Sequence, residues 1–152
     1  MQIGEKAPDF TLPDANGAEF NLSENLGRGL VVYFYPKDDT PGCTKEAIEF
    51  TDMKGEFDAL GITIIGISKD TPAKHGKFST KHDLDVTLLS DAESDVCERY
   101  GTWGEKRMYG KTFMGIERAT FLIDATGTLR QIWRKVKVPG HVADVLEQAR
   151  AL

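Results

Sequence analysis

Two short apolar runs frame a helical pattern near the start of the chain. Leu30 to Tyr35 is unbroken and rich in β-branched and aromatic side chains, and Ile62 to Ser68 is nearly as apolar. Such runs are typical of strands that are buried on both faces of a sheet. From Ala47 to Leu60, apolar residues recur at offsets of three and four, which predicts an amphipathic helix that Gly61 ends. Residues 30–68 should therefore form a βαβ unit with parallel strands and a right-handed crossover.

The rest of the chain predicts further short strands and helices. Residues 10–22 alternate around an Asn16-Gly17 pair that favours a hairpin turn. After the βαβ unit we expect a helix at 70–82, a strand at 86–89, a short helix at 92–100, a glycine-punctuated loop at 101–115, a hairpin of strands at 119–124 and 129–135, and a helix at 142–152. This order predicts an α/β fold, with a central mixed β-sheet flanked by helices and an N-terminal β-hairpin.

Length and charge limit the domain count and the partners. With 152 residues, the chain should form a single domain over residues 1–152. Its 24 acidic and 19 basic residues give a net charge of −5 without a basic stripe, which argues against a nucleic-acid partner. No apolar run is long enough to cross a bilayer, and no charged and apolar leader opens the chain. We therefore expect a cytoplasmic protein with no membrane partner, and the alternative is a mature exported form whose leader has been removed.

The segment between the first strand and the helix holds the candidate chemistry. Pro36 ends the strand, and Thr40-Pro41 is a helix start in which Thr40 can cap the first free amides. Cys43 should lie in the first helical turn, where outward-pointing amides favour a thiolate, the reactive form of cysteine. Thr40 and Glu46 flank Cys43 at three residues on either side, so both can approach the sulfur. This neighbourhood favours a reactive cysteine over the inert buried one that a free cysteine usually is.

Arg118 stands at the start of a strand that otherwise turns apolar. An unpaired guanidinium there would be costly unless it met an anion. The residues alone leave two alternatives, a surface ion pair and a contact with an anionic group at a site, and they favour the surface ion pair.

The spacing of Pro36, Thr40 and Cys43 resembles the signature of the peroxiredoxins. The string from Tyr35 to Glu46 is similar to that of the subgroup called PrxQ or bacterioferritin comigratory protein (BCP). The same resemblance extends through residues 4–10, 88–91, 109–112 and 118–124. It covers nearly the whole chain. It implies a thioredoxin-like fold and an arginine, matched here by Arg118, that touches the reactive sulfur.

The resemblance further implies a thiol-dependent peroxidase that needs no cofactor. The Cys43 thiolate would attack the terminal oxygen of hydrogen peroxide or an organic hydroperoxide and become a sulfenic acid. Thr40 would hydrogen-bond to the peroxide, while Arg118 and the helix amides would stabilise charge on the departing oxygen. Pro36 would shield the pocket from water, and Glu46 would orient the arginine.

Recycling departs from the commonest pattern of the subgroup. The positions that can carry a second, resolving cysteine hold Ile48 and Phe78-Ser79 here. Cys97 is the remaining candidate, but its place on a short helix favours a packed residue, and a bridge to Cys43 needs Cα atoms within about 7 Å. We therefore expect a one-cysteine mechanism in which thioredoxin, glutaredoxin or glutathione attacks the sulfenic acid.

Other sites and functions have less support. His75, His82 and His141 are scattered and lack partners at ligand spacing, so we expect surface or helix positions and no metal. A non-enzymatic redox sensor or holdase that uses oxidation of Cys43 stays open as an alternative. A thiol–disulfide exchanger is disfavoured because no Cys-x-x-Cys pair is present. The resemblance implies a monomer, with a dimer as the alternative.

Overall fold

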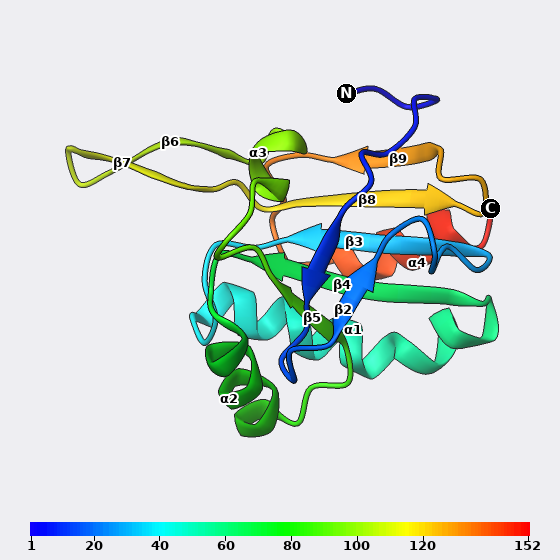
Figure 1. Ribbon diagram of the computed structural model, residues 1–152, viewed down its shortest axis with the longest axis horizontal. Coiled ribbons are helices and arrows are strands. Elements are labelled where there is room, and N and C mark those ends of the chain that lie inside the picture. The colour runs from blue at the N-terminus through cyan, green and yellow to red at the C-terminus, as the bar shows by residue number, and fades with distance from the viewer.

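A five-stranded sheet forms the centre of the computed structural model, which describes residues 1–152. The strand order is β5 (Thr87–Ser90), β4 (Ile62–Ser68), β3 (Gly29–Phe34), β8 (Ala119–Asp124) and β9 (Leu129–Trp133) (Figure 1). Strand β4 pairs in parallel with β3 and β5, whereas β8 pairs antiparallel with β3 and β9. The predicted central mixed sheet is confirmed.

The βαβ unit forms where the apolar pattern placed it. Helix α1 (Pro41–Ala59) joins β3 to β4, and the two strands pair in parallel with Val31 opposite Ile64. Every residue of β3 is buried, as expected for a strand covered on both faces. Because α1 begins soon after β3 ends, the first turn of the helix lies at the carboxyl end of this central strand.

Alternate strand positions divide the core into two layers. On one face, Val31 and Tyr33 pack with α1 and α4 (His141–Ala149) in what we call the helix-side layer. On the other face, Leu30 and Val32 pack with the N-terminal segment and α3 (Val96–Arg99) in the N-terminal-side layer. The sheet therefore separates two sets of buried side chains.

The N-terminal hairpin is also confirmed. Strands β1 (Thr11–Pro13) and β2 (Glu19–Asn21) pair antiparallel outside the central sheet. In the turn, Oδ1 of Asp14 accepts the N–H groups of Asn16 and Ala18, and Gly17 has a left-handed backbone with φ of 83°. The turn chemistry thus fixes the hairpin locally.

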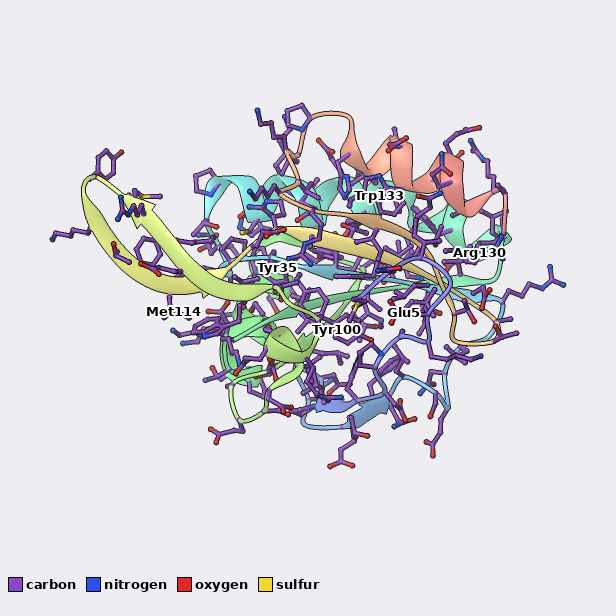
Figure 2. The ribbon with its side chains drawn as sticks, turned by 90° about the horizontal axis from the view of Figure 1, so that it is seen from above. Glu5, Tyr35, Tyr100, Met114, Arg130 and Trp133 are labelled. Atoms are coloured by element: carbon purple, nitrogen blue, oxygen red, sulfur yellow. The ribbon has the colours of Figure 1, made fainter.

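The predicted loop at 101–115 is a second hairpin, so that prediction was wrong. Strands β6 (Trp103–Met108) and β7 (Lys111–Ile116) pair antiparallel and extend away from the rest of the molecule (Figures 1 and 2). Tyr109 and Gly110 both have positive φ, at 53° and 76°, which suits a tight hairpin turn. Most side chains of the hairpin are exposed or half-buried, so no apolar–polar alternation marked its strands.

Two further helices complete the fold. Helix α2 (Pro72–His82) lies beside edge strand β5 and places Phe78 in the helix-side layer. Helix α3 is shorter than the predicted 92–100, because the Asp91 carboxylate accepts the N–H groups of Val96 and Cys97 and fixes the helix start there. None of the helices has the length and apolar character that a bilayer crossing requires.

Candidate active site

Cys43 lies in the first turn of α1, as the helix-start pattern predicted. Pro41 is the first helical residue, and Thr40 before it has the extended backbone of a cap residue, with φ of −93° and ψ of 155°. The first amides of a helix have no partner within it and favour negative charge beside them. Cys43 is only 1% exposed, so its reactivity depends on the few groups that contact it.

Thr40 does not cap the helix with its side chain, in contrast to the prediction. Its hydroxyl donates to the carbonyl oxygen of Lys37 at 2.9 Å. A threonine can satisfy its hydroxyl on nearby backbone in this way instead of at the helix amides. The hydroxyl oxygen keeps lone pairs that can accept a hydrogen bond from a ligand.

Arg118 reaches the cysteine because of how β8 pairs. The register of β3 and β8 sets Ala119 opposite Phe34, so Arg118 lies beside the end of β3. Its Nη2 donates to Sγ of Cys43 at 3.3 Å, and its Nη1 donates to Oε1 of Glu46 at 2.7 Å. Of the two alternatives for Arg118, the contact at a buried site is the one that the structure forms.

Gly42 makes room for this guanidinium, a role that sequence reasoning did not find. A Cβ atom at Gly42 would lie 3.1 Å from Nη2 of Arg118. Because that distance is shorter than most Cβ contacts, a side chain at Gly42 would push the guanidinium away from the sulfur. No pattern in the sequence indicates this close approach, which depends on a residue far along the chain.

Glu46 places a carboxyl group in the interior beside the cysteine. The residue is 0% exposed, and burial raises the pKa of Glu46 to about 7 although the nearby Arg118 guanidinium opposes the rise. Oε1 accepts from Arg118, but Oε2 has no hydrogen-bond partner. Glu46 can therefore gain or lose a proton near neutral pH while it still holds the arginine.

His141, the first residue of α4, lies next to the unpaired Glu46 oxygen. Its Nε2 is 4.0 Å from Oε2 of Glu46 and 2.8 Å from Oγ1 of Thr120. Burial lowers the pKa of His141 to about 4, so the ring is neutral at neutral pH. His141 is helical as predicted, but it is buried, so the alternative of a surface position was wrong. Sequence reasoning missed this neighbour because the three residues come from separate elements.

The loop before the cysteine is anchored by a buried histidine. Asp38 accepts a hydrogen bond from the Tyr35 hydroxyl at 2.6 Å and lies 2.7 Å from Nδ1 of His75. Nε2 of His75 lies 3.0 Å from the carbonyl oxygen of Leu89. His75 is therefore a packed residue of α2 and not a surface residue, because all of its polar atoms have partners inside the protein.

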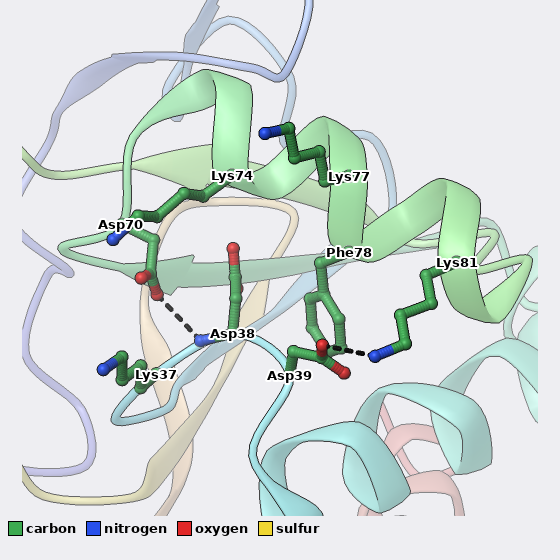
Figure 3. A pocket seen from close by; sticks show the side chains of 8 residues that line it. All are labelled: Lys37, Asp38, Asp39, Asp70, Lys74, Lys77, Phe78 and Lys81. Carbon is green, nitrogen blue, oxygen red and sulfur yellow. Dashed lines mark hydrogen bonds and ion pairs between the residues drawn. The ribbon is translucent and has the colours of Figure 1, made fainter.

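A pocket of about 230 Å³ separates this loop from α2. Figure 3 shows the backbone N–H of Asp38 donating to Asp70 and Lys81 reaching from α2 to Asp39, at 2.8 and 2.7 Å. Eight residues line it: Lys37, Asp38, Asp39, Asp70, Lys74, Lys77, Phe78 and Lys81. Cys43 is not among them, so this pocket is separate from the sulfur.

Pro36 instead lines a hollow of about 360 Å³ between the loop and the β6–β7 hairpin. The hairpin contributes Trp103, Phe113 and Met114 to its walls, along with Lys106. Burial lowers the pKa of Lys106, the Arg118 charge lowers it further, and the Cys43 sulfur acts in the opposite sense. Cys43 and Arg118 do not line this hollow, but Arg118 follows its wall residue Ile116 by two positions in the chain.

Cys97 has different surroundings. It is 0% exposed in the N-terminal-side layer, whereas Cys43 lies in the helix-side layer, and both cysteines are free. Burial, reinforced by the neighbouring Asp91 carboxylate, raises the pKa of the Cys97 thiol well above its usual range. Cys97 is therefore a protonated, packed thiol, and the sheet lies between it and Cys43.

Known proteins are similar to this chain over most of its length. Residues 3–132 match the AhpC/TSA family. The chain is 50% identical to peroxiredoxin Bcp of Bacillus subtilis over 147 residues, which cover 97% of this chain and 94% of that protein. It is 44% identical to peroxiredoxin Bcp of Escherichia coli over 141 residues, which cover 93% of this chain and 90% of that protein.

Solved structures give the same result for the fold. The bacterioferritin comigratory protein of Xanthomonas campestris matches with a TM-score of 0.88 and 42% identity, over 93% of this chain and 90% of that chain. PrxQ of Xylella fastidiosa, solved as a cysteine-to-serine mutant, matches with a TM-score of 0.93 and 36% identity, over 99% of this chain and 96% of that chain. The predicted thioredoxin-like fold is confirmed. The chain therefore belongs to the peroxiredoxins, a family of thiol-dependent peroxidases, and within them to the PrxQ or Bcp subgroup.

Proposed function

We propose that this peroxiredoxin reduces hydrogen peroxide and organic hydroperoxides through a sulfenic acid on Cys43, and that an external thiol recycles it. The observation that carries the proposal is the contact of 3.3 Å between Nη2 of Arg118 and the Cys43 sulfur. A guanidinium at that distance favours the thiolate, which is the nucleophilic form. The same cation can then bind the oxygens of a peroxide.

In the first step, the thiolate of Cys43 attacks the terminal oxygen of R–O–OH and the O–O bond breaks. The sulfur becomes S–OH, and RO⁻ leaves and takes a proton to form an alcohol or water. Arg118 and the first amides of α1 stabilise the charge on the departing oxygen. The Thr40 oxygen accepts a hydrogen bond from the peroxide, and its bond to Lys37 holds it in place.

Two further residues support the nucleophile. Glu46 holds Nη1 of Arg118 and thereby directs Nη2 of the same guanidinium to the sulfur. Pro36 lies in the wall of the hollow between the loop and the β6–β7 hairpin, and its role in the proposal is to keep bulk water from the sulfur. The apolar part of that hollow, formed by Trp103, Phe113 and Met114, can accommodate the organic group of a hydroperoxide.

The position of Cys97 supports recycling by an external thiol. Cys97 is protonated, fully buried and in the other layer of the core, so it is neither nucleophilic nor near the sulfenic acid. Thioredoxin, glutaredoxin or glutathione can supply the reducing thiol instead. It attacks the sulfenic sulfur and releases water, and a second thiol then releases Cys43 from the mixed disulfide.

Mass spectrometry of the intact protein after one equivalent of peroxide tests this proposal. We expect wild type and Cys97→Ser to gain one oxygen, and Cys43→Ser to gain none. Loss of two hydrogens in wild type alone would show a Cys43–Cys97 disulfide and contradict recycling by an external thiol. Turnover of peroxide with dithiothreitol then separates a peroxidase from a redox sensor, which would be oxidised once without turnover.

A further inference from the structure

The β6–β7 hairpin carries a cluster of exposed apolar side chains. Met108, Tyr109, Phe113 and Met114 are 57%, 96%, 43% and 54% exposed, and they make up half of the large exposed hydrophobic residues of the chain. Figure 2 shows Met114 on this projecting ribbon. Clustered apolar side chains on a soluble protein mark interaction sites more often than scattered ones do.

The pairing register shows which of these side chains share a face. Lys106 lies opposite Phe113, Met108 opposite Lys111, and Gly104 opposite Gly115. Because side chains alternate along a strand, these pairs project to one side, which we call the inner face of the hairpin. A Cβ atom at Gly115 would lie 3.1 Å from Cδ of Lys106 and 3.5 Å from Phe113. The long side chains therefore cover the glycine positions at the base of this face.

The inner face begins near the arginine that contacts Cys43. Lys106 and Phe113 line the hollow that also contains Pro36 and Ile116, and Arg118, which donates to the Cys43 sulfur, follows Ile116 by two residues. From there the face runs outward through Met108 and Lys111 to the turn. A protein that covers this face therefore also covers the hollow lined by Pro36, Lys106 and Phe113.

The charges of the hairpin favour one kind of partner. The charged side chains of the inner face are Lys106 and Lys111, and neither forms an ion pair, although the whole chain has a net charge of −5. Two copies of the chain that met through this face would bring like charges together. An acidic partner would be attracted to it, and the apolar side chains would add contact area.

From these observations we propose that the inner face of the hairpin is the docking surface for the reductant. We infer that the reductant is a folded dithiol protein with acidic and apolar residues around its reactive cysteine. The inference rests on the proposed function, because a sulfenic acid on Cys43 must first form. The partner thiol attacks that sulfur and displaces water, and its second cysteine then breaks the mixed disulfide. Cys43 returns as a thiol while the partner leaves as a disulfide.

Steady-state turnover with three reductants tests the proposal. The reductants are a bacterial thioredoxin with its reductase and NADPH, a glutaredoxin with glutathione, and dithiothreitol. In the double variant Met108→Ser/Lys111→Glu, we expect kcat/KM for the better protein reductant to fall at least tenfold. Lys111→Glu alone should lower it severalfold, and more strongly at low salt. Turnover with dithiothreitol and the rate of oxidation by hydrogen peroxide should stay within twofold of wild type.

Matched surface variants serve as controls. Ile3 is 56% exposed, so Ile3→Ser removes a comparable apolar group at the N-terminus, and Lys77→Glu reverses a charge on α2. Both variants should have the same turnover as wild type with each of the three reductants. Circular dichroism and thermal unfolding of each variant show whether the central fold is intact.

Several results would overturn the proposal. One is an unchanged kcat/KM for the protein reductant in the double variant, and another is an equal loss with dithiothreitol. A third is a wild-type dimer in solution that Phe113→Ser dissociates, since the face would then bind a second copy. A fourth is binding to anionic lipid vesicles that the double variant abolishes. If neither protein reduces the wild type while dithiothreitol does, docking fails but the peroxidase function stands.

Discussion

The two cysteines of this peroxiredoxin are almost equally buried, yet their surroundings differ in charge. Cys43 is 1% exposed and contacts the guanidinium of Arg118, whereas Cys97 is 0% exposed and lies beside the Asp91 carboxylate. A cation favours a thiolate and a carboxylate disfavours it. Exposure alone therefore does not identify a reactive cysteine. The charge that faces the sulfur and a path for the substrate distinguish a reactive cysteine from an inert one.

Backbone position adds to the difference between the two sulfurs. Cys43 occupies the first turn of α1, a helix that runs from Pro41 to Ala59, whereas Cys97 occupies a short helix of four residues. In α3 the amides of Val96 and Cys97 are already satisfied by Asp91. Only the first turn of α1 is placed to stabilise negative charge on a cysteine.

The largest expected effect comes from removing the cation at Cys43. Arg118→Leu should lower the rate constant for oxidation by hydrogen peroxide by about 10²–10³-fold, the usual loss when one donor to developing charge is removed. Arg118→Lys keeps the charge but cannot hold Glu46 and the sulfur together, so we expect an intermediate rate. Stopped-flow mixing with peroxide, followed by tryptophan fluorescence, measures both constants.

A control for this experiment is Arg134→Gln. Arg134 pairs with Glu117 on the surface at 2.8 Å and does not contact the cysteine. The Arg134→Gln variant should have the same rate constant for oxidation by hydrogen peroxide as wild type. If Arg118→Leu reacted as fast as Arg134→Gln, the charge beside Cys43 would not explain its reactivity, and the contrast with Cys97 would lose its basis.

The next largest effect is the pH dependence of the free energy of unfolding that the Glu46 proton causes. Burial raises the pKa of Glu46 from its ordinary 4.5 to about 7, so between these values the folded protein binds a proton that the unfolded chain does not. The free energy of unfolding should therefore fall as the pH rises through this window. At about 1.4 kcal/mol per pKa unit, the Glu46 proton contributes on the order of 3 kcal/mol to the free energy of unfolding below this window. Glu46→Gln should remove it.

Urea unfolding of wild type and Glu46→Gln at pH 5 and pH 8 measures this contribution. His141 acts with the opposite sign, because burial lowers its pKa from 6.5 to about 4 and stability is lost as the pH falls through that window. The His141 contribution cancels when the two proteins are compared at each pH. Parallel pH profiles for the two proteins would contradict a Glu46 pKa near 7.

Local patterns predicted the elements that carry Cys43. The apolar runs and the Thr40-Pro41 start identified β3, α1 and β4, because burial on both faces and the stereochemistry of proline act over a few residues. The hairpin β6–β7 was missed because its strands bury little and so carry no periodic signal. Strands that bury neither face against the core have no reason to alternate apolar and polar residues.

Contacts between distant segments were the least predictable part of the site. The residues alone favoured a surface ion pair for Arg118, and only the family resemblance placed it at the sulfur. The approach of Arg118 to Gly42 and that of His141 to Glu46 depend on how distant segments pack against α1, which no local pattern encodes. Thr40 was identified, but its hydroxyl bonds to Lys37 and not to the helix amides.

The smallest expected effect comes from replacing Cys97. Cys97→Ala removes one buried sulfur from the N-terminal-side layer and should lower the free energy of unfolding by about 1 kcal/mol. The backbone N–H of residue 97 still reaches Asp91, so α3 should remain folded. Because the sheet separates this thiol from Cys43, the rate of oxidation by peroxide and turnover with dithiothreitol should stay within twofold of wild type. Urea unfolding and stopped-flow kinetics measure the two quantities on the same preparation. A tenfold loss of turnover with an unchanged oxidation rate would mean that Cys97 takes part in recycling, and that its burial in this structure is not the state in which it reacts.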